Sequence, residues 1–245
     1  MLYGSSGPKA RSSRIEKKVA SVISVVIPTL NAEDHLVRTL TALMPGVVEG
    51  LIKEVVIVDG GSTDSTLEIA ESTGCRIVHA DAARGLQLWQ GCREARGEWL
   101  MILHSDSQLG DGWLDPVENH VRNFPAQAGY FHIRFEEPSL LARLWGEFVA
   151  LRARFLALPS GDHGMLISRA LYDCVGGYKD QVAFEEVALS MSLGRARLRP
   201  IPVSLGTSAS RFKARGWAVG TVGRALQFGL YLLGIPPKPP VKRLA

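Results

Sequence analysis

The chain contains two stretches that decide its fold, SVVIPTLN (residues 24–31) and VVIVDGGSTD (residues 55–64). Each is a run of mostly β-branched residues that stops at a polar turn and gives way to a helical pattern. Such runs are typical of buried parallel strands, and parallel strands end at the same edge of a sheet. The pair therefore predicts that Asn31 and Asp59 lie together at the edge where α/β sheets bind ligands.

The same alternation continues along the chain. Apolar runs predict strands at residues 22–27, 55–58, 76–79, 99–103, 128–135 and 164–168. Helical spacing predicts helices at residues 32–43, 65–74, 85–95, 140–158, 184–193 and 217–233. Because strands that alternate with helices form right-handed crossovers, we expect one α/β domain over residues 21–235, with a mostly parallel sheet flanked by helices and a C-terminal apolar helix.

Composition narrows the class of protein. Lys and Arg number 28 against 24 Asp and Glu, a net charge of +4 that is too mild to indicate nucleic acid. Three separate cysteines without a Cys-x-x-Cys pair, and no signal-peptide pattern, argue against a disulfide scaffold or structural zinc and favour the cytoplasm. Residues 1–20 are basic and turn-rich, which predicts a flexible arm, and residues 236–245 form a Pro- and Lys-rich tail.

Three strand-end residues are the first candidates for a ligand site. Asp59 can accept hydrogen bonds from a base or ribose, although a simple Asp-Gly turn is the alternative. Arg84 can stack on a base or pair with a phosphate, unless it is a solvated surface charge. Asp106 follows the run WLMIL (residues 99–103), a position that suits either a ligand of Mg²⁺ or Mn²⁺ or the N-cap of a helix.

A second group of polar residues lies further along the chain. Glu185 and Glu186 open a predicted helix, and adjacent helical positions point about 100° apart, so we expect only one carboxylate to face the ligand edge. The alternative is that the acidic pair only stabilises the helix dipole. Asp162 and His163 lie in a predicted loop, where they can reach a ligand or simply build a turn.

Five motifs occur in a fixed order along the chain. They are VDGGSTD (residues 58–64), RG (84–85), HSDS (104–107), GDH (161–163) and EEV (185–187). Over about residues 22–235 they resemble the family-2 glycosyltransferases, and most closely the bacterial arsenosugar-biosynthesis glycosyltransferases. The resemblance implies a GT-A-type domain with a divalent metal, Mg²⁺ or Mn²⁺, at the end of the fourth strand. Two residues depart from the pattern: His104 replaces the first Asp of the broader family, and His163 replaces the subgroup's Gln.

The resemblance also implies roles for individual residues. Those implied in nucleotide binding are Pro28, Thr29, Asn31, Asp59, Gly61, Ser62, Arg84, Ser105 and Asp106. Asp106 is the implied metal ligand, with His104 as a second candidate. Glu186 is the implied general base, with Glu185 as its alternative and Asp162 as a further catalytic candidate. Those implied to contact the acceptor or the leaving diphosphate are His163, Arg211 and Arg215.

The sequence therefore predicts an inverting glycosyltransferase that moves a sugar from a UDP- or GDP-sugar to an acceptor hydroxyl. A sugar-nucleotide binding protein without transfer activity is the alternative, because His104 stands where the family has a carboxylate. A nicotinamide-dependent oxidoreductase is disfavoured, since no Gly-x-Gly-x-x-Gly follows the first strand.

The C-terminal segment at residues 216–235 is apolar apart from Arg224, and basic residues follow it. Because an arginine at mid-span is costly to insert and several glycines dilute the run, we do not expect it to span a bilayer. It predicts either a helix packed on the domain or on a second copy in a homo-oligomer, or a peripheral helix at the inner membrane surface near a lipid-linked acceptor.

Overall fold

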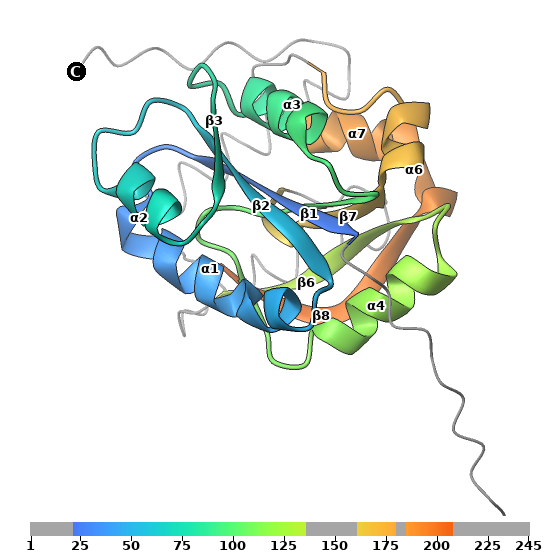
Figure 1. Ribbon diagram of the computed structural model, residues 1–245. Coiled ribbons are helices and arrows are strands. Elements are labelled where there is room, and N and C mark those ends of the chain that lie inside the picture. The colour runs from blue at the N-terminus through green and yellow to red at the C-terminus, as the bar shows by residue number, and fades with distance from the viewer. Residues whose placement is uncertain (1–21, 136–160, 180–184, 208–245) are drawn as a thin grey trace, which may run out of the picture.

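The computed structural model describes residues 22–135, 161–179 and 185–207, and a sheet of eight strands runs through them (Figure 1). The order of the strands is β3-β2-β1-β4-β7-β6-β8-β5. Their bounds are β1 (Ile23–Thr29), β2 (Ile52–Asp59), β3 (Arg76–His79), β4 (Trp99–Ile102), β5 (Gln108–Leu109), β6 (Ala128–Phe135), β7 (Met165–Ser168) and β8 (Leu198–Thr207). The predicted α/β class is confirmed.

The first four strands form the parallel half of the sheet. β1 pairs with β2 on one side and with β4 on the other, and β2 pairs with β3, all in parallel register. Thr29 lies opposite Asp59 at the end of the β1–β2 pair. The apolar runs of the sequence thus deliver their terminal polar residues to one edge, as predicted.

The other half of the sheet is mixed. β7 runs antiparallel to both β4 and β6, β5 runs antiparallel to β8, and β6 runs parallel to β8. Sequence patterns missed β8 because Pro200 and Pro202 argue against a strand. The β6–β8 register shifts between Tyr130 and His132, opposite this proline-containing stretch.

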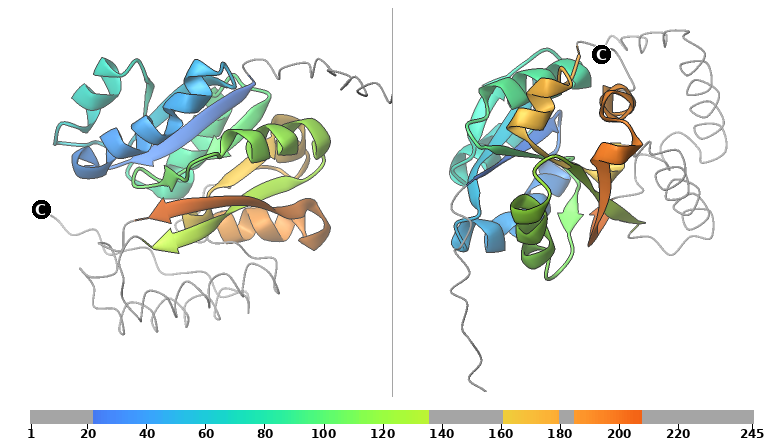
Figure 2. Two further views of the ribbon diagram at one scale, coloured as in Figure 1. Left: turned by 90° about the horizontal axis from the view of Figure 1, so that it is seen from below. Right: turned by 90° about the vertical axis from the view of Figure 1, so that its right-hand side faces the viewer.

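Helices cover both faces of the sheet (Figure 2). Their bounds are α1 (Glu33–Val48), α2 (Thr66–Ser72), α3 (Arg84–Glu94), α4 (Leu114–Asn123), α6 (Arg169–Cys174) and α7 (Glu185–Leu193), with 3₁₀ turns η1 (Gly161–His163) and η2 (Arg195–Arg197). One core packs α1, α2 and α4 on residues such as Ile27 and Met101, and the other packs α3, α6 and α7 on residues such as Val26 and Leu100. Successive strand residues serve opposite cores, as the pleat requires.

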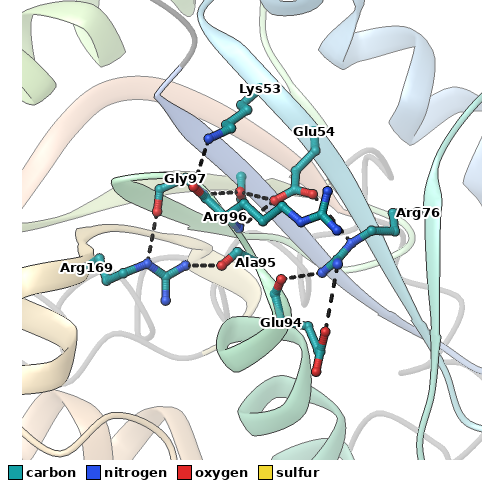
Figure 3. A network of polar contacts seen from close by, with 9 residues as sticks. Lys53, Glu54, Arg76, Glu94, Ala95, Arg96, Gly97 and Arg169 are labelled. Atoms are coloured by element: carbon teal, nitrogen blue, oxygen red, sulfur yellow. Dashed lines mark hydrogen bonds and ion pairs between the residues drawn. The ribbon is translucent and has the colours of Figure 1, made fainter.

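The edge opposite the predicted site is held by a polar network (Figure 3). The guanidinium of Arg169 donates to the carbonyls of Gly97, Cys92 and Ala95, at 3.0, 3.1 and 2.6 Å. Arg169 therefore satisfies carbonyls at the C-terminal end of α3, a position where helices leave them unpaired and where a cation is favoured. Glu54 on β2 accepts hydrogen bonds from Ser24 and from the backbone of Arg96 in the same network.

The first helix was predicted at residues 32–43, before Pro45, but α1 includes Pro45 and continues to Val48. Gly46 packs so tightly on Trp113 that a Cβ would lie 2.5 Å from the ring. The predicted helices at residues 140–158 and 217–233, with the arm and the tail, lie outside the described residues. Within the described part of the chain, no helix combines the length and apolar character that crossing a membrane requires.

Candidate functional site

Asp59 organises the loop that follows β2. One carboxylate oxygen accepts hydrogen bonds from the backbone N–H groups of Gly61 and Ser62, at 2.8 and 2.9 Å. The other accepts from the hydroxyls of Ser62 and Thr29. Burial would raise the pKa of Asp59, but these hydrogen bonds outweigh burial and hold the pKa below its ordinary value. The carboxylate is ionised and fully engaged by its own loop, so a nucleotide that binds it must share or displace one of these donors.

Asn31 ties the end of β1 to the same loop. Its backbone N–H donates to the Ser62 hydroxyl, and its side-chain carbonyl accepts from the backbone of Thr63 at 2.8 Å. Asn31 has a left-handed φ of 51°, a conformation that asparagine tolerates better than most residues. Gly61, with φ at 93°, supplies the matching turn on the other side. The predicted residues of both strand ends are therefore brought together.

Gln87 joins these two strand ends from α3, and sequence patterns did not single it out. Its buried amide nitrogen donates to the backbone carbonyls of Thr29 and Val58, at 2.9 and 2.8 Å. These two bonds fix the relative positions of β1 and β2 directly before the site. The signal was present in the sequence, because Gln87 is a polar residue inside the apolar stripe that includes Leu88 and Gly91.

Arg84, the first residue of α3, holds both candidate bases. Its Nε lies 3.1 Å from the Glu185 carboxylate, and its Nη2 forms an ion pair with Glu186. The expectation that only one of the two glutamates would face the ligand edge is therefore wrong. Long glutamate side chains in a first helical turn can converge, and the forked guanidinium offers separate nitrogens to each of them.

The acidic pair sits in a strongly perturbed environment. Glu185 is only 4% exposed, and burial together with the charge of Glu186 raises its pKa to about 7, although Arg84 opposes this. One guanidinium faces two carboxylates, so the arginine cannot neutralise both when both are ionised. A carboxyl group with a pKa close to neutrality is suited to proton transfer.

His104 completes this cluster from the end of β4. Its Nε2 accepts a hydrogen bond from Nη2 of Arg84, because a guanidinium can only donate. The same nitrogen lies 3.7 Å from the Asp162 carboxylate on η1. The structure thus gathers Arg84, His104, Asp162 and the two glutamates from four separate segments of the chain.

Asp106 and Ser105 follow at the same strand end. Asp106 is 6% exposed, and the carbonyl of Ser105 accepts a hydrogen bond from Thr39 on α1. The alternative of Asp106 as a helix N-cap is not supported, since the next helix begins at Leu114. Among the described residues, no group of three or more His, Cys, Asp and Glu side chains could hold a metal by itself. A buried carboxylate here fits a metal that takes most of its ligands from phosphates and water.

The remaining predicted residues lie at the margin of this arrangement. His163 is buried, with its ring packed edge-on against Tyr130 on β6. Pro28 lies within β1, next to Thr29. Arg211 and Arg215 fall outside the described residues, so their predicted contacts stay predictions.

Tyr178 is a second residue that sequence patterns missed. It is 2% exposed, and it packs in the core that α3, α6 and α7 share. Burial and the nearby charge of Glu186 raise the pKa of Tyr178 well above its ordinary value, so the hydroxyl keeps its proton. Tyr178 lies outside any helix or strand, so hydrophobic periodicity in the sequence does not indicate that it is buried.

Comparison with known proteins places these features in context. The profile of glycosyl transferase family 2 matches residues 24–172, more than half of the chain. A glucosyl-3-phosphoglycerate synthase of Mycolicibacterium paratuberculosis is 33% identical over 98 residues, which cover 36% of this chain and 30% of that protein. The chain thus spans less than a third of that relative's length.

Two solved structures share the fold. Mannosyl-3-phosphoglycerate synthase from Rubrobacter xylanophilus superimposes with a TM-score of 0.60 at 19% identity, covering 92% of this chain and 79% of the other. Glucosyl-3-phosphoglycerate synthase from Mycobacterium tuberculosis, solved with Mn²⁺, UDP and glucosyl-3-phosphoglycerate, gives a TM-score of 0.54 at 23% identity, covering 76% and 71%. Since the family profile extends over most of the residues that build the sheet and its ligand edge, this chain belongs to glycosyl transferase family 2.

Proposed function

We propose that this protein transfers a sugar from a nucleotide-diphosphate donor, a UDP- or GDP-sugar, to an acceptor hydroxyl by a single displacement with inversion. The observation that carries the proposal is the convergence of Glu185 and Glu186 on Arg84, next to His104 at the end of β4. A chain of this family that gathers two carboxylates beside a strand-end histidine has the groups that acceptor activation requires.

The nucleotide is assigned to the two linked strand ends. Hydrogen bonds link the end of β1, with Thr29 and Asn31, to the loop that begins at Asp59. Gln87 on α3 donates to the carbonyl of Thr29 and so holds this arrangement in place. Arg84 lies one helical turn from Gln87, where its charge is suited to a diphosphate or a base. Support also comes from the related synthase that was solved with UDP.

A divalent metal is assigned to Asp106, with His104 as the second candidate ligand. When bound, the metal would neutralise charge on the departing diphosphate, and magnesium or manganese requires only one or two protein carboxylates for this. The position of the buried Asp106 carboxylate shortly after the end of β4 supports this assignment.

Glu186 is assigned as the general base that takes the acceptor proton, with Glu185 as its alternative and Asp162 as a further candidate. The raised pKa of Glu185, about 7, means that the pair exchanges a proton in the neutral range. Both carboxylates project from the first turn of α7, so a small side-chain rotation decides which of them reaches the acceptor.

A second candidate function is sugar-nucleotide binding without transfer. The observation that favours it is the engagement of His104 by Arg84, because the family's carboxylate is replaced by an imidazole whose Nε2 is already occupied. This reading predicts donor binding of ordinary affinity with neither hydrolysis nor transfer.

The two functions are separated by one set of measurements. Thermal-shift titrations with UDP and GDP, each with and without Mn²⁺, should show a metal-dependent rise in melting temperature for one of them. Release of that nucleotide from its glucose or mannose conjugate is then followed, with water, sugars and 3-phosphoglycerate as acceptors. Turnover that Asp106→Asn abolishes supports the transferase, binding without turnover supports the binding protein, and neither binding nor turnover contradicts both.

Finer assignments rest on the sequence alone. The resemblance to arsenosugar-biosynthesis glycosyltransferases, a cytoplasmic site of action and a bacterial source are proposed on that basis. The apolar segment at residues 216–235 is proposed to contact either a second copy of the chain or the membrane surface. Flotation with anionic liposomes at low and high salt distinguishes these two roles.

A further inference from the structure

Three buried polar atoms at one place lack a hydrogen-bond partner among the described residues. They are Nε of Arg84, Oε1 of Glu186 and the hydroxyl oxygen of Tyr178. Nε of Arg84 lies 3.1 Å from the Glu185 carboxylate, and Oε1 of Glu186 pairs with Nη2 of Arg84, so both atoms keep an electrostatic partner without the alignment of a hydrogen bond. The tyrosine hydroxyl has no such compensation. Buried polar groups without partners are rare in native proteins and need a reason.

The position of Tyr178 is built rather than incidental. Gly176 and Gly177 both adopt left-handed backbone, with φ at 83° and 58°, and a Cβ on Gly177 would lie 2.5 Å from the ring of Tyr172. The hydroxyl of Tyr172 accepts the backbone N–H of Tyr178 at 3.0 Å, and the two rings pack edge to face. This turn delivers the Tyr178 ring to the core that α3, α6 and α7 share, and α3 carries Arg84 while α7 carries Glu186.

Arg84 faces two incompatible demands in the proposed reaction. While it pairs with Glu186, it stabilises the ionised carboxylate and so makes it a weaker base. A donor diphosphate is a stronger attraction for a guanidinium, and pairing with it draws Arg84 away from the glutamate. Glu186 then retains a buried oxygen that requires another donor, and the Tyr178 hydroxyl is an unclaimed donor close enough for the Glu186 charge to raise its pKa.

We propose, on the basis of the function assigned above, that Tyr178 is a positioning residue for the base. When Arg84 turns to the diphosphate, the Tyr178 hydroxyl donates a hydrogen bond to the Glu186 carboxylate and holds it toward the acceptor. Among the described residues, the hydroxyl has no hydrogen-bond partner. A neutral donor can orient the carboxylate while suppressing its basicity less than a full positive charge does.

Other charged or titratable groups surround this position on every packed element. They are Arg84 and Cys92 on α3, Glu185 on α7, Asp162 on η1, His104 after β4, and Tyr172 and Asp173 on α6. Arg84 and the two glutamates dominate, because they are in direct contact with one another. The tests below therefore vary Tyr178 with and without the arginine.

The first test uses Tyr178→Phe, which removes only the hydroxyl, and measures hydrolysis of UDP-glucose with Mn²⁺, where water serves as the acceptor. We expect kcat to fall about tenfold with KM for UDP-glucose within about twofold, and the acid limb of the kcat profile to move up by about one pH unit. The melting temperature should stay equal or rise, because an unpaired buried hydroxyl is removed. A wild-type rate and acid limb in this variant overturn the proposal.

Tyr172→Phe is the matched control, because it removes a hydroxyl from the same core. That hydroxyl has a partner, so its loss leaves the backbone N–H of Tyr178 unpaired and should lower the melting temperature by about 2 to 4 °C. The acid limb should not move. A purely structural role for Tyr178 predicts the Tyr172 behaviour in both variants.

The second test needs no donor. In an Arg84→Gln background, where the guanidinium is gone, ¹³C NMR of labelled glutamate carboxyl groups follows the titration of Glu186, which Glu186→Gln assigns. Adding Tyr178→Phe should raise the titration midpoint by about one pH unit, since a donor to the charged form is lost. Equal midpoints overturn the proposal even if the enzyme is active. A wild-type protein that neither binds UDP or GDP nor hydrolyses their sugar conjugates contradicts the proposed function instead, and this titration then decides the role of Tyr178.

Discussion

The Arg84 guanidinium donates a hydrogen bond to Nε2 of His104 at the end of β4. The same guanidinium pairs with Glu185 and Glu186 at the start of α7. Among the described contacts, Arg84 is therefore the group that links the strand-end histidine to the acidic pair.

Arg84→Gln should lower the free energy of unfolding by about 3 kcal/mol at pH 8, because it leaves two nearly buried carboxylates without their cation. Arg84→Lys should lose less, since one ammonium group keeps the charge but cannot reach both glutamates and His104 in a fork. Urea denaturation at pH 8 measures both variants. An Arg84→Gln protein as stable as the wild type at that pH would show that the ion pairs contribute nothing.

Glu185 predicts a specific dependence of stability on pH. Its pKa is raised to about 7 in the folded protein, so the folded state binds a proton that the unfolded state has released. Its contribution to stability is therefore complete below about pH 4.5 and is lost as pH rises to about 7. Glu185→Gln should be more stable than the wild type by about 2 kcal/mol at pH 8, with little difference at pH 4. Parallel stability curves across this range would exclude the raised pKa.

Glu186→Gln should reduce kcat by about 10²- to 10⁴-fold with little change in donor affinity, which is the usual effect of losing a general base. The measurement is steady-state kinetics with the donor found in the nucleotide screen, together with calorimetric binding of its nucleotide. Glu185→Gln is the matched control on the neighbouring position. If Glu185→Gln shows the large kcat loss and Glu186→Gln does not, the two roles are exchanged.

Gln87→Leu should lower the free energy of unfolding by about 2 kcal/mol, because the carbonyls of Thr29 and Val58 lose a buried donor. Nucleotide affinity should fall as well, since the Asp59 loop is no longer anchored from α3. Gln90→Leu, on the exposed side of the same helix, removes one hydrogen bond to the carbonyl of His79 and should change stability by less than about 0.5 kcal/mol. Equal effects of the two substitutions would contradict the anchoring role.

Sequence patterns predicted the parallel half of the sheet because its strands are apolar, β-branched and bounded by turns. β8 was missed, since Pro200 and Pro202 remove two backbone donors, and its position depends on pairing with β6 and β5 rather than on local pattern. The prediction ended α1 at residue 43 because Pro45 and Gly46 are typical helix breakers, whereas the structure keeps both in the helix, with Gly46 packed on Trp113.

In the predicted site, too, some features follow from local sequence pattern and others depend on tertiary contacts. Strand-end residues such as Asp59 and Asp106 are found by position alone, because a strand fixes where its end lies. Other features depend on side-chain torsions, which the sequence does not specify. They are the hydrogen bonds from the loop to Asp59 and the pairing of two adjacent glutamates with one arginine. Gln87 and Tyr178 act from inside the core, where a polar residue is recognised only once its neighbours are known.

The three carbonyl contacts of Arg169 at the far end of α3 restrict how the site can respond to a ligand. Sliding α3 along its axis would strain these contacts, while its first residue is tied to α7. We therefore expect Arg84 to respond to a ligand by rotation about its side-chain bonds, with the helix itself staying in place along its axis.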